Sequence, residues 1–136
     1  MGLAEKRVIK SFQEGTFKEL VKKINTVAGK KLAVEVDWDS LAEDGMSHLY
    51  EDSWSKVYFE PVITALTSVC ADDMGKKAVA GNLNKIVIKN EAGNFSPRSF
   101  SNFENKILTL DHKPTSNIDD VKDRAEKLQE VLENGL

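Results

Sequence analysis

The most constraining feature of the sequence is an apolar stripe that keeps its phase across a proline. Its members recur at intervals of three and one residues, as one face of a helix does: Trp54, Val57, Tyr58, Pro61, Val62, Ala65, Leu66, Val69 and Cys70. An interior proline costs a helix about 3 kcal/mol, whereas burial of each large apolar side chain stabilises by about 1.5–3 kcal/mol. The stripe therefore predicts one buried helix that kinks near Val57 or restarts with Pro61 in its first turn.

Cys70, the only cysteine of the chain, closes this stripe. A thiol in an apolar interior packs as a small hydrophobic group, and carboxylates such as Asp72 and Asp73 raise the pKa of a nearby thiol. We therefore interpret Cys70 as a core residue and not as a nucleophile. A single cysteine cannot form an internal disulfide, which fits a reducing compartment.

The region before the stripe predicts a helix and then a strand. Thr16 and Glu19 form a capping box for an amphipathic helix over residues 17–28, which Gly29 is suited to end. The segment before Gly15 is ambiguous and predicts another helical turn or two. Residues 32–38 alternate in hydrophobicity, as a strand with one wet face does, which favours an antiparallel or edge position.

The region after the stripe predicts a short helix, three strands and a last helix. Asp72 or Asp73 is suited to cap a helix that ends near Gly81. Residues 85–89, 98–104 and 107–112 then indicate an antiparallel meander. Ser116 or Asn117 is suited to cap the last helix.

Together these elements predict an α+β fold. We expect a two-layer sandwich of about four mostly antiparallel strands with helices packed on one face, in the order α-β-α-α-β-β-β-α. The early strand pairs most simply with the meander. Nothing in the sequence divides the chain, so we expect residues 1–136 to form a single globular domain.

Composition places the chain among soluble cytoplasmic proteins. Of its 136 residues, 40% are hydrophobic and 30% are charged, which is ordinary for one such domain. No apolar run approaches the roughly 18 residues of a membrane span, and the N-terminus lacks the apolar stretch of a signal peptide. The net charge of −3 is uneven: residues 1–34 carry +5, while residues 35–60 carry −7.

Most sequence signatures of catalysis are missing. The chain has no glycine-rich dinucleotide or phosphate loop, no Cys-x-x-Cys zinc motif and no Gly-x-Ser-x-Gly elbow. We therefore expect no cofactor, and we favour binding over enzymatic activity.

Polar residues at two strand ends are the best candidates for chemistry. Asp37 and Asp39 end the strand of residues 32–38, while Asp111 and His112 end the strand of residues 107–112. If these ends converge, the four side chains would form an acid–base site. Parallel strands would bring them to one sheet edge, whereas adjacent antiparallel strands would hold them about 20 Å apart. The alternative is that they are solvated caps and turn formers.

A second candidate cluster precedes the long helix. His48, Glu51 and Asp52 have spacings that could place them on one helical face, as ligands of a metal ion would require. Helix caps and a solvated helix start explain the same residues.

Nucleic-acid binding is disfavoured. Lysines cluster in and after residues 17–28, and a strand mixes aromatic rings with a base, as stacking platforms do: Phe95, Arg98, Phe100 and Phe103. However, Phe100 and Phe103 have opposite strand parity, and the isoelectric point near 5.5 argues against a basic footprint.

The long helix is the best candidate for a partner surface. Besides its stripe it carries Phe59 and Ile63, and so wide an apolar face must be covered by the core or by another chain. We expect a non-catalytic module that binds a protein partner or a small-molecule ligand, as a monomer or homodimer. The alternative is a small metal-dependent or acid–base enzyme that uses Asp37, Asp39, Asp111 and His112.

Overall fold

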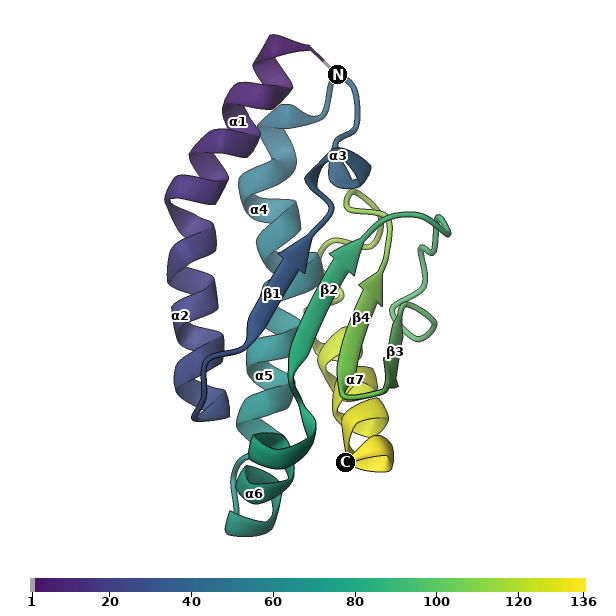
Figure 1. The fold of residues 1–136 in the computed structure, drawn as a ribbon. Helices are drawn as coiled ribbons and strands as arrows, with labels where there is room; N and C mark the ends of the chain where they lie inside the picture. Colours follow the sequence, from purple (N-terminus) through teal and green to yellow (C-terminus); the bar gives the residue numbers. More distant parts are fainter. Residues whose placement is uncertain (1) are drawn as a thin grey trace.

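A four-stranded mixed sheet with helices packed against it forms the protein in the computed structural model, which describes residues 2–136 (Figure 1). The α+β class that the sequence predicts is confirmed. The elements in chain order are α1 (Leu3–Glu14), α2 (Thr16–Ala28), β1 (Ala33–Val36), α3 (Trp38–Leu41), the 3-10 turn η1 (Ser47–Leu49), α4 (Tyr50–Trp54), the π-helical turn η2 (Ser55–Phe59), α5 (Glu60–Val69), α6 (Asp73–Asn82), β2 (Lys85–Lys89), β3 (Ser101–Glu104), β4 (Ile107–Asp111) and α7 (Val121–Gly135).

The sheet is mostly parallel, so the predicted mostly antiparallel sheet is wrong. Its strand order is β1-β2-β4-β3, in which β1 pairs with β2 and β2 with β4 in parallel, while β3 and β4 are antiparallel. The predicted meander is wrong because β4 lies between β2 and β3. The helices between β1 and β2 carry the chain back along the sheet, and such a return makes two neighbouring strands parallel.

The hairpin between β3 and β4 pairs two strands that follow each other in the chain. Its two central residues, Asn105 and Lys106, have φ angles of 53° and 66°. Positive φ at both positions is the mark of a type I′ turn, whose twist matches that of the flanking strands. The tight turn that the sequence predicts at these residues is confirmed.

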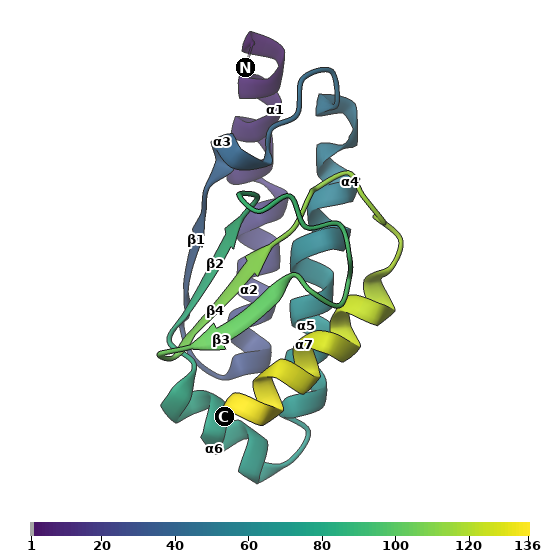
Figure 2. The ribbon, with the colours of Figure 1, turned by 90° about the vertical axis from the view of Figure 1, so that its right-hand side faces the viewer.

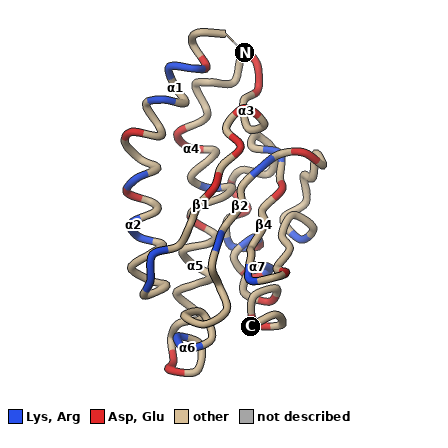
Figure 3. Tube along the Cα trace, in the orientation of Figure 1, with Lys and Arg blue, Asp and Glu red and all other residues tan. Residues whose placement is uncertain are grey.

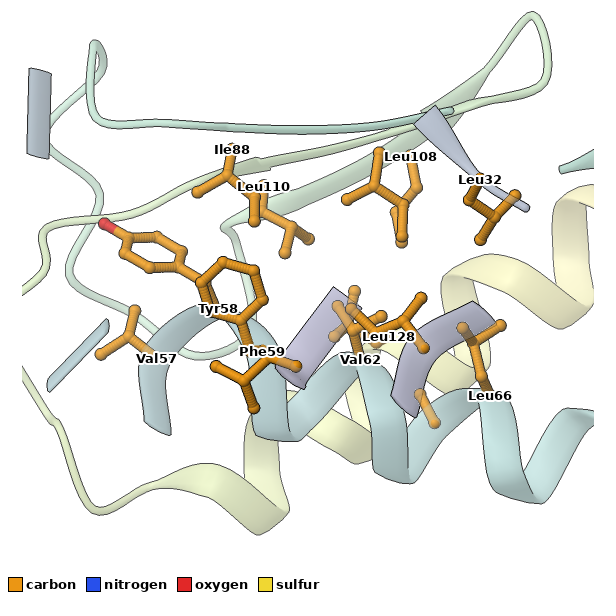
Figure 4. Packing of buried hydrophobic residues seen from close by; sticks show 14 of the residues in the cluster. Leu32, Val57, Tyr58, Phe59, Val62, Leu66, Ile88, Leu108, Leu110 and Leu128 are labelled. Carbon is orange, nitrogen blue, oxygen red and sulfur yellow. The ribbon is translucent and has the colours of Figure 1, made fainter. Parts of the chain in front are cut away.

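One face of the sheet packs against helices. Figures 1 and 2 show α1, α2, α4, α5 and α7 on the same side of it. Side chains of β2 and β4 alternate between complete burial on that side and partial exposure on the other. Figure 4 shows Ile88, Leu108 and Leu110 facing Val62 and Leu128. We refer to the other side, on which Figure 2 shows no helix of residues 2–136, as the open face.

The central helix runs across Pro61 as the stripe predicts, and every member of the stripe is buried. The π-helical turn η2 joins α4 to α5, and the amide of Glu60 donates to the carbonyl of Ser55, five residues back. Pro61 then lies in the first turn of α5, directly after this π turn. A π turn inserts one extra residue, so Phe59 is buried together with its neighbours.

The ambiguous N-terminal segment is a full helix, α1, which buries Ile9 and Phe12. The ring of Phe12 lies edge-on to Trp54, with a centroid distance of 5.3 Å, and Phe17 of α2 lies edge-on to Phe59 at 5.7 Å. These aromatic contacts attach the two N-terminal helices to the central helix.

The two later helices show one correct and one incorrect cap prediction. The Asp72 carboxylate accepts from the amide of Gly75 at 2.8 Å, so Asp72 caps α6 as expected. The last helix begins only at Val121, and the predicted cap by Ser116 or Asn117 is wrong. None of the helices in residues 2–136 combines the length and apolar character that a membrane crossing requires.

Candidate functional site

The carboxyl ends of β1, β2 and β4 meet at one edge of the sheet, because these strands are parallel. In open α/β sheets this edge commonly holds ligands. Lys89 pairs with Asp111, and Asp37 follows Val36, whose register partner Ile88 precedes Lys89. The structure therefore brings Asp37 and Asp111 to one row of the sheet, with Lys89 between them.

Asp111 anchors the loop that follows β2. Its carboxylate accepts from the backbone amides of Glu91 and Ala92 at 2.9 and 3.2 Å. Its main-chain carbonyl accepts from the side-chain amide of Asn94 at 3.0 Å. These bonds fix the loop against the end of β4, which is the turn-forming role that the sequence left as an alternative.

Asp37 and Asp39 belong to the start of α3. The Asp37 side chain accepts from the amide of Ser40 at 3.3 Å as an N-cap, while Asp39 is exposed within the same short helix. The hydrogen bond from Lys89 to Glu91 raises the pKa of Lys89, and the charges of Asp111 and Asp37 add to the rise. The lysine thus remains charged between the carboxylates.

His112 lies on the opposite side of the sheet from Asp37 and Asp111. Its ring is buried and lies edge-on to Phe100, with a centroid distance of 5.5 Å. Its Nδ1 lies 2.5 Å from the carbonyl oxygen of Lys113, while Nε2 has no hydrogen-bond partner in residues 2–136. Burial lowers the pKa of His112. Asp37 and Asp111 thus share one row of the sheet, whereas Asp39 belongs to α3 and His112 lies in the core.

A buried polar cluster around His112 was not foreseen from the sequence. The Tyr58 hydroxyl donates to the carbonyl of His112. The guanidinium of Arg124, fully buried in α7, donates to three consecutive carbonyls, those of Ser116, Asn117 and Ile118. The cluster holds the segment between β4 and α7 away from helical geometry, which explains the late start of α7. One sequence signal could have shown this cluster: Arg124 precedes Ala125 and falls within the apolar stripe of α7.

His48, Glu51 and Asp52 do not converge on one point. Glu51 accepts from the hydroxyl of Thr16, and Asp52 forms an ion pair with Lys56 at 3.2 Å. His48 is exposed in η1. Within residues 2–136, no group of three or more His, Cys, Asp or Glu side chains is placed to hold a metal ion.

Cys70 is a core residue, as its periodicity predicts, with 8% of its surface exposed. Burial raises the pKa of its thiol, while the charge of Lys76 lowers it by less. A raised pKa disfavours the thiolate that a nucleophile needs.

The aromatic residues considered for nucleic-acid stacking are dispersed. Phe100 is 2% exposed beside His112, and the half-buried Phe103 lies against Gly135 of α7. Phe95 alone of the three is exposed, in the loop after β2.

A shallow groove of about 460 Å³ lies between α2 and α5. It is lined by Glu19, Lys22, Lys23, Thr26, Val27 and Ile63. Val27 and Ile63 are half-buried and form its apolar part, while the α2 side chains of Lys22 and Lys23 are exposed. Ile63 packs against the core cluster and contributes the rest of its side chain to the groove.

Comparison of the chain with protein-family models, curated proteins and solved structures finds no match.

Proposed function

We propose that this chain is a non-catalytic protein-binding module and that the α2–α5 groove receives an acidic, apolar segment of its partner. One observation carries the proposal: the half-buried Ile63 of α5 lies beside exposed lysines of α2. From Pro61 to Ala71 the chain has no charged residue, and the exposed Thr67 follows Ile63 by one helical turn.

The lysines give the groove its charge preference. Lys18, Lys22 and Lys23 are exposed along α2, with Glu19 as the acidic residue among the groove-lining side chains. Figure 3 shows basic positions recurring along α1 and α2, while α5 carries none. An acidic segment with an apolar side chain directed at Ile63 would complement both the positive charge of the lysines and the apolar part of the groove.

The groove favours a peptide segment over a small molecule. Small-molecule sites generally enclose most of their ligand, whereas this groove is shallow and formed by two helices. A peptide needs less enclosure, because it distributes its contacts along the groove.

The polar residues of the sheet edge support a binding role over catalysis. The Asp111 carboxylate accepts backbone hydrogen bonds, Asp37 caps α3 and His112 is buried. A general base must reach the proton that it removes from a substrate, and this arrangement leaves His112 without a path to one.

Selection of peptides tests the proposal. Phage-displayed helical peptides would be selected on the folded chain, and we expect acidic sequences with a spaced apolar residue to be enriched. Their affinity should fall by at least tenfold for the double variant Lys22→Glu and Lys23→Glu, about 1.4 kcal/mol, and also for Ile63→Asp.

The matched control makes the same charge change elsewhere. Lys76→Glu combined with Lys77→Glu on α6 reverses two exposed lysines outside the groove. This double variant should leave peptide affinity nearly unchanged. Equal losses for both double variants, or no enrichment of acidic peptides, would reject the proposed groove.

A further inference from the structure

The loop between β2 and β3 is longer than its path requires. It runs from residue 90 to residue 100 and crosses from one side of β4 to the other. Two strand spacings amount to about 10 Å, which roughly three extended residues can span at about 3.3 Å each. The loop uses eleven residues, so most of its length serves something other than the connection.

Hydrogen bonds hold the additional residues of this loop in one conformation. At its start, the amide of Asn90 donates to the hydroxyl of Ser40 at 3.0 Å. The Asp111 carboxylate then accepts from the next two amides, as described above. Further along, the amide of Lys113 donates to the carbonyl of Asn94 at 2.7 Å. The loop is therefore anchored to α3, to β4 and to the segment after β4.

The anchoring extends to Phe95 itself. The side-chain amide of Asn117 donates to the main-chain carbonyl of Phe95, and the residue before Phe95 is bonded to Lys113. Yet 65% of the Phe95 surface remains exposed, whereas Phe100 at the end of the same loop is 2% exposed. Core packing thus explains the placement of Phe100 but not that of Phe95.

We propose that Phe95 is a preorganised aromatic anchor that inserts into an apolar pocket on a partner protein. Aromatic residues dominate the energetic centres of protein interfaces. Ordering a loop on binding normally reduces affinity, and a loop already ordered avoids that loss. Arg98, exposed in the turn that follows, favours a partner whose pocket is bordered by carboxylates.

The aromatic arrangement favours a protein over a nucleic acid. Stacking on single strands uses successive rings, and here the neighbouring Phe100 is buried.

This surface is separate from the α2–α5 groove. Figures 1 and 2 show the loop beyond β4 on the β3 side of the sheet, while α2 lies toward β1. The anchor can therefore fail while the groove proposal stands, and the reverse is also possible.

Selection of small folded binding proteins tests the anchor. A phage-displayed library of three-helix domains with a randomised face would be selected on the full chain. We expect most independent binders to lose at least tenfold in affinity for Phe95→Ala. Met74→Ala on α6 is the control, because Met74 is an apolar residue outside the loop that is 82% exposed. Binders that are insensitive to Phe95→Ala, or equally sensitive to Met74→Ala, would overturn the proposal.

A second variant tests preorganisation without removing the ring. Asn117→Gly deletes the bond to the Phe95 carbonyl and tolerates the φ of 51° at this position, and we expect it to slow association and weaken those binders severalfold. Unchanged affinity would refute the role of loop order. Single-stranded oligothymidylate serves as the other probe. Binding of this probe that depends on Phe95 would replace the protein partner with a nucleic acid.

Discussion

The hydroxyl of Tyr58 in the central helix donates a hydrogen bond to the main-chain carbonyl of His112 at the end of β4. Desolvation by burial raises the pKa of Tyr58 well above its ordinary value, so the phenol stays a donor. The bond joins the helical layer to the sheet edge at which the candidate residues lie. That edge is consequently held by buried polar contacts as well as by apolar packing.

Removing this hydroxyl should destabilise the fold. Tyr58→Phe leaves the buried carbonyl of His112 without its donor, which should lower the free energy of unfolding by about 1–2 kcal/mol. Chemical denaturation measures the change. Thr67→Val is the control, because the Thr67 hydroxyl donates to the carbonyl of Ile63 in an exposed part of α5. That variant should change stability by less than about 0.5 kcal/mol.

The pH dependence of stability should reveal the burial of His112. Burial lowers the pKa of the folded-state imidazole, and Arg124 lowers it further, while Lys113 and Asp111 oppose this. Below the unfolded-state pKa of about 6.5, the unfolded chain binds a proton that the folded chain does not. The free energy of unfolding should therefore fall as pH decreases from about 6.5, by up to about 1.4 kcal/mol per pH unit, until the folded-state pKa is reached.

Two histidine variants show which histidine causes this pH dependence of stability. His112→Gln should remove the loss of stability between about pH 6.5 and 5, whatever its effect at neutral pH. His48→Gln should preserve the loss, because His48 is exposed in η1. A slope that survives His112→Gln and disappears with His48→Gln would contradict the burial argument.

Two glycines of α6 should respond oppositely to alanine. A Cβ at Gly75 would lie 1.7 Å from the carbonyl oxygen of Val69, whereas nothing lies within 4 Å of a Cβ at Gly81. Gly75→Ala must displace backbone and should destabilise by more than about 2 kcal/mol. Gly81→Ala, at a helical position, should stabilise by about 0.5–1 kcal/mol. Thermal unfolding of the pair compares them directly, and similar shifts would show that the close approach at Gly75 is absent.

The thiol of Cys70 should react slowly while the chain is folded. It is 8% exposed and burial raises its pKa, so a thiol-specific reagent should modify it only as fast as the structure opens. Denaturant should restore rapid labelling. Ser68→Cys supplies an exposed thiol on the same helix as a control when combined with Cys70→Ala. Equal labelling rates at the two positions would contradict the core assignment.

How far the sequence predicts this structure depends on whether a feature is local. The central helix was predictable because burial of one face imposes the spacing from Trp54 to Cys70 on the sequence. The strand positions were recognisable for the same reason. Pairing direction was not, because the alternation of Lys85–Lys89 suits a strand in either direction and depends on the path of the connecting chain.

Strand alternation separates two of the four candidate residues, Asp111 and His112. Asp111 and His112 are consecutive in an extended chain, so their side chains point to opposite faces of the sheet. One had to lie on the open face and the other in the core. The loop amides that bind the Asp111 carboxylate lie 19 and 20 residues away in the sequence. No local sequence pattern predicts such a contact.

The role of Asp111 can be separated from catalysis by measuring order and stability together. If the carboxylate anchors the loop, Asp111→Ala should lower stability by about 1–3 kcal/mol, because two backbone amides lose a charged acceptor. Hydrogen exchange at Glu91 and Ala92 should accelerate, while the amides of β4 exchange at their former rates relative to global unfolding. Asp39→Ala, at an exposed position of α3, is the matched control and should change neither quantity. Intact stability and unchanged exchange in Asp111→Ala would instead free this carboxylate for a chemical role.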